Sequence, residues 1–143
     1  MKKLLIALLF CILTLGIVSV ASAAEWKWVQ GNMDYIWHFD TQSLKKVNDT
    51  TYSVWIKQEY NAAIGKETAE QFNFKAPVAY DLTKCEYDFR DKTFRSVAVS
   101  YYNKKGRVLS SDKTHEQWRA IFPDTVGEEI FNKTYEYYKK YYK

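Results

Sequence analysis

The chain has 143 residues and a formal net charge of only +4 at pH 7, with 21 Lys and Arg against 17 Asp and Glu. So small a charge argues against a dedicated nucleic-acid-binding protein, which carries a strongly basic face. The length is enough for one domain with a core of its own. The 12 tyrosines favour a sheet with one solvated face, because the ring packs while the hydroxyl stays hydrated; the alternative is an adhesive recognition face.

The N-terminal residues have the pattern of an export signal. Two lysines precede a long apolar run, which ends at the small-residue cleavage site Ala21-Ser22-Ala23. We therefore expect residues 1–23 to be a signal peptide and residues 24–143 to form the mature domain. A retained membrane anchor is the alternative, because the apolar run is near the lower length limit for a spanning helix. The predicted location is the periplasm or the cell surface, with membrane contact only through the transient signal peptide.

Two strands are predicted at the start of the mature chain. Residues 25–30 alternate polar and aromatic side chains, which is typical of a strand. We expect Trp26 and Trp28 to share one face of this strand and to help cap the core. Residues 33–40 predict a second strand with aromatic side chains along one side.

A turn and the clearest strand of the chain follow. The Asp40 side chain is expected to accept backbone hydrogen bonds two residues on and to begin a turn that includes Ser43. Residues 51–60 then alternate regularly and predict a strand. Its apolar face comprises Tyr52, Val54 and Ile56. Trp55 interrupts the polar face, which indicates a position at an edge or an interface.

The middle of the chain contains a long connection and then a three-stranded meander. Residues 61–77 lack a steady period, so we expect a long loop, in which residues 66–72 form one or two helical turns or lengthen a hairpin. Residues 78–112 hold three runs of β-forming side chains separated by polar turns. Gly106 supplies the positive φ that the second turn demands.

The C-terminal part is predicted to be helical. Residues 116–122 have the look of a short helical turn, and Thr125 with Glu128 form a capping box at the start of a helix. An amphipathic helix is expected from about residue 126 to 142, with its apolar face on the sheet. The fold class that follows is α+β: a single antiparallel sheet of about six strands covered on one face by a C-terminal α-helix.

The sequence contains no recognisable catalytic or cofactor-binding motif. His38, Asp40 and Ser43 have the residue types of a hydrolytic triad, but no glycine loop for an oxyanion accompanies them, and a turn explains Asp40 and Ser43. Neither His38 nor His115 has the spacing of a metal ligand. We therefore expect no enzyme, no cofactor and no metal site, and a small hydrolase is only a distant alternative.

Basic side chains cluster at the tip of the second hairpin of the meander. Lys104, Lys105 and Arg107 lie within one turn, and further basic residues occur on the final helix: Lys133, Lys139, Lys140 and Lys143. The simple interpretation is a solvated surface. The functional interpretation is a contact for acidic glycans or glycoproteins, to which Trp55 would contribute an aromatic surface.

Taken in order, a set of landmarks resembles the surface-adhesin protein E-like domain of bacterial exported proteins. The landmarks are Trp28-Val29, the turn Phe39-Asp40-Thr41-Gln42-Ser43-Leu44, Val54-Trp55-Ile56, Cys85, Tyr101-Tyr102 with Gly106-Arg107-Val108, Trp118 with Ile121 and Pro123, and Gly127-Glu128. The resemblance covers nearly all of residues 24–143. It implies an antiparallel sheet with a C-terminal helix tethered on its concave side and, for the founding adhesin, binding of host extracellular-matrix and serum glycoproteins.

The chain departs from this family pattern at one cysteine. The resemblance pairs the strand cysteine with a second cysteine in the final helix, but here Tyr135 stands where that cysteine is expected. Cys85 is therefore left as an unpaired thiol. Either it is buried as a small apolar group, or it forms a disulfide-linked homodimer or a mixed disulfide.

The sequence is compatible with two functions. The first is an exported, non-enzymatic binding module of the adhesin type, with host matrix or serum glycoproteins as partners. The alternative is a periplasmic structural or envelope-maintenance protein with no host partner.

Overall fold

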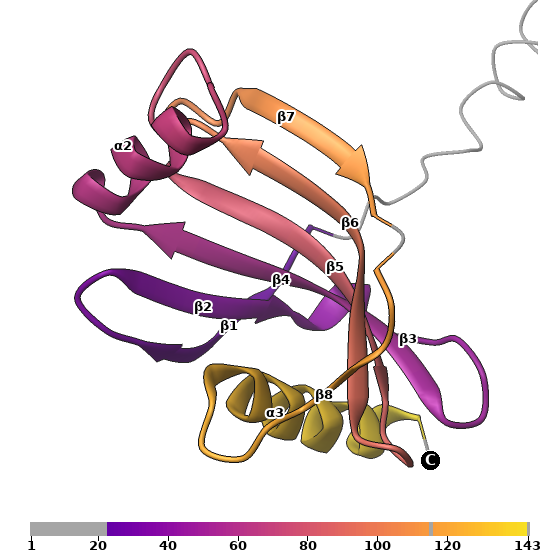
Figure 1. Ribbon diagram of the computed structural model, residues 1–143. Coiled ribbons are helices and arrows are strands. Elements are labelled where there is room, and N and C mark those ends of the chain that lie inside the picture. The colour runs from indigo at the N-terminus through magenta and orange to yellow at the C-terminus, as the bar shows by residue number, and fades with distance from the viewer. Residues whose placement is uncertain (1–22, 115, 143) are drawn as a thin grey trace, which may run out of the picture.

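The computed structural model describes residues 23–114 and 116–142, so the predicted signal peptide lies outside the described residues. The main path of the antiparallel sheet runs β1-β2-β4-β5-β6-β7 (Figure 1). These strands are β1 (Trp26–Gly31), β2 (Tyr35–Asp40), β4 (Thr51–Tyr60), β5 (Tyr80–Asp88), β6 (Thr93–Tyr102) and β7 (Val108–Lys113). Two short strands, β3 (Lys45–Lys46) and β8 (Arg119–Ala120), pair with β4 and β6. The remaining elements are the 3-10 turn η1 (Thr41–Ser43) and the helices α2 (Ala62–Gln71) and α3 (Val126–Tyr141).

The predicted fold class is confirmed, because one antiparallel sheet carries a C-terminal helix on one face. The strand predicted at residues 51–60 is β4, and its alternate side chains Tyr52, Val54 and Ile56 are buried. The meander is also present as β5, β6 and β7. Gly106 has a φ of +72° in the β6–β7 turn, which is the left-handed conformation that glycine adopts most readily.

Helix α3 packs through aromatic side chains onto the centre of the sheet. Tyr52 stacks on Tyr138 with ring centroids 4.8 Å apart and on Tyr87 at 5.5 Å. Phe131 lies 6.0 Å from the Tyr87 ring and is 5% exposed. Ile130 is also buried in this core. The helix is therefore held by its own apolar face, as the sequence predicts.

The start of α3 follows the predicted cap with one difference. The Glu128 backbone N–H donates to Thr125 Oγ1 at 3.2 Å. In return, the Glu128 carboxylate accepts a hydrogen bond from the backbone N–H of Asp124 at 2.9 Å, rather than from Thr125. Asp124 has a φ of +57°, which turns its N–H toward the helix. The cap thus satisfies two backbone donors, one of which lies a residue earlier than in a standard capping box.

The prediction of a long loop over residues 61–77 was wrong. Helix α2 begins there, with the Asn61 side chain accepting from the Ile64 N–H at 2.8 Å. Its buried side consists of Gly65 and Ala69, and the backbone at Gly65 touches Val78: a Cβ atom there would lie 2.0 Å from the Val78 carbonyl oxygen. A contact surface made of Gly and Ala gives almost no apolar period, and this is why the pattern did not reveal the helix.

Two further expectations were wrong. Residues 116–122 do not form the predicted helical turn, and residues 119–120 form the short strand β8 instead. Arg119 of β8 pairs with Phe94 of β6, and a pairing between such distant residues leaves no local pattern in the sequence. Trp26 and Trp28 do not cap the core, because their partners on β2 are Asp40 and His38, whereas Lys27 between them is opposite the buried Phe39. Val29, on the other side of the alternation, is 0% exposed, whereas Trp28 is 59% exposed.

Both helices lie on the same face of the sheet, at its two ends (Figure 1). Phe72 and Phe74, which follow α2, pack against Tyr101 of β6 at 5.6 and 5.3 Å. Tyr101 is opposite Asp81 of β5, and alternation along β5 puts Asp81 on the side of Tyr87, beneath α3. We call this side the inner face and the opposite side the outer face. Within residues 23–114 and 116–142, no helix has the length and apolar character needed to cross a membrane.

Candidate functional site

The outer face of the sheet carries a row of aromatic and basic side chains that crosses several strands. Trp55, Lys57 and Glu59 of β4 lie on this face, because they alternate with the series that begins Tyr52, Val54 and Ile56, which are buried on the inner face. Tyr80 on β5 is opposite Glu59, and Tyr102 on β6 is opposite Tyr80. The register therefore aligns these side chains across three adjacent strands.

The rings and one lysine of this row are in direct contact. Lys57 Nζ lies 5.0 Å from the Tyr80 ring centroid and 6.0 Å from that of Trp26, within the range of cation–π attraction for both. Tyr80 and Tyr102 stack with centroids 4.8 Å apart and planes 8° apart. Lys57 also forms a 2.6 Å ion pair with Glu59. We call Trp26, Lys57, Tyr80 and Tyr102 the aromatic ladder.

The basic hairpin tip adjoins one end of the ladder. Asn103 shapes the tip, because its side-chain oxygen accepts from the backbone N–H groups of Lys105 at 2.9 Å and Arg107 at 3.0 Å. Lys104, Lys105 and Arg107 are all exposed. The Tyr80 hydroxyl lies 3.9 Å from the position that a Cβ atom would take at Gly106, so the tip folds beside the ladder.

Trp55 lies on the same face but farther from the tip. It is half-buried and opposite Lys84, four positions along β4 from Glu59. At about 3.3 Å a residue this separation is about 13 Å. The register thus places Trp55 on the face of the ladder, and the turn that carries the other three predicted contact residues adjoins the ladder at Tyr80. Lys57, Tyr80 and Tyr102 were missed from the sequence, where only the cross-strand register would have linked them.

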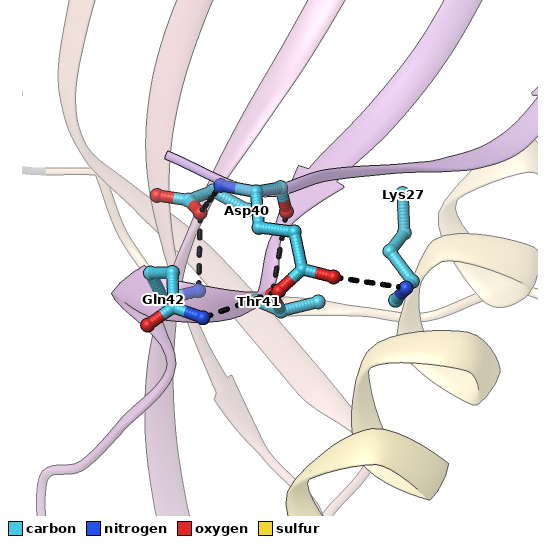
Figure 2. Close-up of polar contacts among 5 residues, drawn as sticks. Lys27, Asp40, Thr41 and Gln42 are labelled. Carbon is cyan, nitrogen blue, oxygen red and sulfur yellow. Dashed lines mark hydrogen bonds and ion pairs between the residues drawn. The ribbon is translucent and has the colours of Figure 1, made fainter. Parts of the chain in front are cut away.

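Asp40 and Ser43 have structural contacts that account for both. The Asp40 carboxylate accepts from the backbone N–H groups of Glu25 at 2.9 Å and Gln42 at 3.0 Å (Figure 2). Ser43 Oγ donates to the Asp40 carbonyl at 2.8 Å and accepts from the Trp55 backbone N–H at 2.9 Å. Ser43 thereby completes the hydrogen bonding of β4 where η1 interrupts the neighbouring strand. Both groups serve the turn, as the sequence predicts.

His38 also lies on the outer face, beside the ladder. Its Nδ1 is 3.8 Å from Glu59 Oε1, and among the described residues this buried nitrogen has no hydrogen-bond partner. Burial lowers the pKa of His38, and nearby Lys57 lowers it further while Glu59 opposes the change. His38 is therefore neutral near pH 7, and the neighbouring Glu59 carboxylate forms its ion pair with Lys57.

Cys85 lies in the core of the sheet. It is 7% exposed, is opposite Val54 of β4, and belongs to the buried cluster under α3. Burial raises the pKa of its thiol to about 12. Tyr135 of α3 stacks on Phe89 with ring centroids 5.1 Å apart, so aromatic packing joins the helix to the sheet side here.

In residues 23–114 and 116–142, no group of three or more His, Cys, Asp or Glu side chains is arranged to hold a metal ion. The features that the structure does bring together are an open sheet face, a row of aromatic rings and a basic hairpin. Aromatic and arginine side chains on an accessible surface are typical of a binding module.

A comparison with protein families also indicates a binding protein. The model of the family described as surface-adhesin protein E matches residues 26–134, which is more than half of the chain, so the protein belongs to this family. The match confirms the resemblance that the sequence landmarks indicate. No curated protein matches the chain. Membership supports an adhesin kind of function and a non-enzymatic role.

Proposed function

We propose that the protein is an exported adhesin domain that binds host extracellular-matrix or serum glycoproteins through the outer face of its sheet. The observation that carries the proposal is the aromatic ladder, in which Lys57 packs on the rings of Trp26 and Tyr80 and the row ends at a basic hairpin. Family membership supports the adhesin class. The ladder and the hairpin suggest how such a domain would hold an acidic glycoprotein.

In this proposal the aromatic ladder and the basic hairpin tip contribute to binding in different ways. The rings are half-buried and pack on each other, so they present fixed apolar faces against which sugar rings or aliphatic side chains can stack at little cost in conformational entropy. Lys57 is already paired with Glu59, so its main contribution is to hold the rings. Lys104, Lys105 and Arg107 at the exposed tip supply the positive charge that draws in an acidic partner.

Binding of the purified mature domain to immobilised matrix proteins and serum glycoproteins tests the proposal, with each glycoprotein tried separately by surface plasmon resonance. The triple variant Lys104→Glu, Lys105→Glu, Arg107→Glu should weaken binding by at least about tenfold. The control Lys45→Glu, Lys66→Glu, Lys92→Glu makes the same change in net charge at exposed positions outside the hairpin. Equal losses in both variants would mean that binding depends on overall charge and would reject the outer face.

Export and display are a separate part of the proposal. The residues before Ala24 have the pattern of a cleavable signal, and the family is one of surface adhesins, so we place the mature domain on the cell surface. Protease treatment of intact cells tests this, because only a displayed protein is cut. Protection in intact cells together with cleavage after the outer membrane is opened would favour the periplasmic envelope-maintenance alternative.

A further inference from the structure

We propose a second binding site, separate from the outer face, in which a short acidic oligosaccharide lies in the groove between α3 and β1. The groove contains a cavity of about 380 Å³ whose walls include Trp28 and Tyr137 together with the charged residues Lys27, Lys133, Glu136 and Lys140, so three ammonium groups and one carboxylate line it. A neighbouring cavity of about 370 Å³ has Tyr137 in its wall as well, together with Glu25, Gln42 and Tyr141. The two cavities therefore lie on either side of Tyr137 along the helix.

Trp28 forms a fixed aromatic wall of this groove. Its indole lies outside the core, beside the register shift of β1, and is 59% exposed. Lys133 of α3 holds it in place, because Lys133 Nζ lies 4.7 Å from the ring centroid and donates to the Val29 carbonyl at 2.5 Å. An exposed indole that is held in one orientation is a surface on which the C–H face of a sugar ring packs.

Positive charge lies along the same helix face. Lys133, Tyr137, Lys140 and Tyr141 recur at intervals of three and four residues, so they line one side of α3. Lys140 Nζ is 5.5 Å from the Tyr141 ring. No carboxylate of the described residues forms an ion pair with Lys133 or Lys140. These two ammonium groups are therefore placed to bind an acid group on a ligand.

The other end of the groove offers hydrogen-bonding groups for sugar hydroxyls. The Glu25 carboxylate accepts from Thr41 Oγ1 at 3.1 Å and from Gln42 Nε2 at 3.2 Å, and it pairs with Lys27 at 3.1 Å (Figure 2). These contacts lower the pKa of Glu25, with Lys27 as the largest cause, and keep the carboxylate ionised as an acceptor. The exposed rings of Tyr141 and Tyr142 lie in the wall beside it.

The arrangement favours an oligosaccharide over an apolar partner. The groove alternates rings with polar groups, whereas an apolar helix or lipid surface requires a continuous apolar face. From Lys133 to Lys140 the helix rises about 10 Å, which suits a short chain of sugars that carries acid groups along its length. The aromatic rings would stack on the sugars, and Glu25 and Gln42 would meet their hydroxyls.

Isothermal titration calorimetry with two matched probes tests this site. A hyaluronan tetrasaccharide carries carboxylates, and chitotetraose is a neutral chain of similar size. The mature domain should bind the hyaluronan probe at least about tenfold more tightly than chitotetraose. Trp28→Ala and Lys140→Ala remove exposed side chains, and each should weaken binding of the acidic probe by about tenfold.

Lys66→Ala, at an exposed lysine of α2 outside the walls of both cavities, is the matched control for Lys140→Ala and should bind the hyaluronan probe like the wild type. Equal affinity for the two probes, or no binding of either up to about 1 mM, would overturn the proposal. So would an equal loss of binding in Lys66→Ala and Lys140→Ala, or unchanged binding in both groove variants. Binding to anionic phospholipid vesicles through Trp28 and Lys140, without saccharide binding, would assign the groove to a membrane surface instead and would also overturn it.

Discussion

The hydroxyl of Tyr52 on β4 lies 2.8 Å from Oγ1 of Thr134 on α3, and both side chains are 0% exposed. Thr134 Oγ1 donates to the Ile130 carbonyl at 2.7 Å, so the Tyr52 hydroxyl must donate to Thr134. This buried hydrogen bond joins the helix to the centre of the sheet. It does so in a chain where Cys85 has no disulfide partner among the described residues.

The two partners of this bond should respond unequally to substitution. Tyr52→Phe should lower the free energy of unfolding by ~1 kcal/mol, because Thr134 keeps its bond to Ile130. Thr134→Val should cost ~1–3 kcal/mol, because it leaves the buried tyrosine hydroxyl without its best acceptor. Urea unfolding measures both, and the double variant should cost less than the two single changes together. Strictly additive costs would mean that the two groups do not interact.

The apolar contacts of α3 should contribute more than its cap. Phe131→Ala and Ile130→Ala remove buried side chains and should each cost ~2–5 kcal/mol. Thr125→Ala loses one capping bond and should cost ~1 kcal/mol. Tyr141→Ala, at a ring that is 57% exposed, is the control and should change stability by less than ~0.5 kcal/mol. A melting temperature of Phe131→Ala equal to that of the wild type would show that this face does not dock the helix.

Local patterns in the sequence were sufficient for the elements that depend on local chemistry. The alternation of residues 51–60 predicts β4 because one side of that strand is buried and the other is not. Thr125 predicts the start of α3 because its hydroxyl bonds a backbone N–H only three residues away. The features that were missed depend on contacts between distant segments. Helix α2 buries only Gly65 and Ala69, so it leaves no apolar period.

The candidate site likewise contains residues that the local sequence reveals and residues that only the fold brings together. The basic residues of the hairpin tip were visible because they are adjacent in the sequence. The aromatic ladder was not, because Trp26, Lys57, Tyr80 and Tyr102 come from four different strands. Trp28 was wrongly expected to cap the core because alternation alone does not say which side of a strand is buried, and in β1 the buried side is that of Val29.

Cys85 should be unreactive in the folded protein. Its thiol is buried and its pKa is raised to about 12, so very little thiolate is present at pH 8. Iodoacetamide should label the native protein only after denaturant is added, and a non-reducing gel should show a monomer. Rapid labelling of a native monomer would contradict the burial. A band at twice the monomer mass that disappears in Cys85→Ser would instead show a disulfide-linked dimer.

His38 should make the protein less stable in mild acid. Burial lowers the pKa of His38 below its ordinary value of 6.5, so the unfolded chain takes up the proton first as the pH falls. The free energy of unfolding should therefore decrease as the pH drops below about 6.5. His38→Gln should show a smaller decrease between pH 7.5 and 5.5, as measured by urea unfolding at each pH. Identical pH dependence in the two proteins would show that Glu59 compensates the burial fully.

The mature protein should begin at Ala24, and the structure gives a reason why cleavage must not fall later. The Glu25 backbone N–H donates to Asp40, and its carbonyl accepts from the Thr41 N–H at 3.0 Å. Cleavage after Ala23 preserves both contacts, whereas cleavage within the first strand would remove them and free the start of β1. N-terminal sequencing and intact mass measurement of the exported protein test the site. Ala23→Tyr, which places a bulky side chain at the cleavage position, should leave the signal attached. Met1 retained on wild-type protein in a membrane fraction would contradict cleavage and would support the anchor instead.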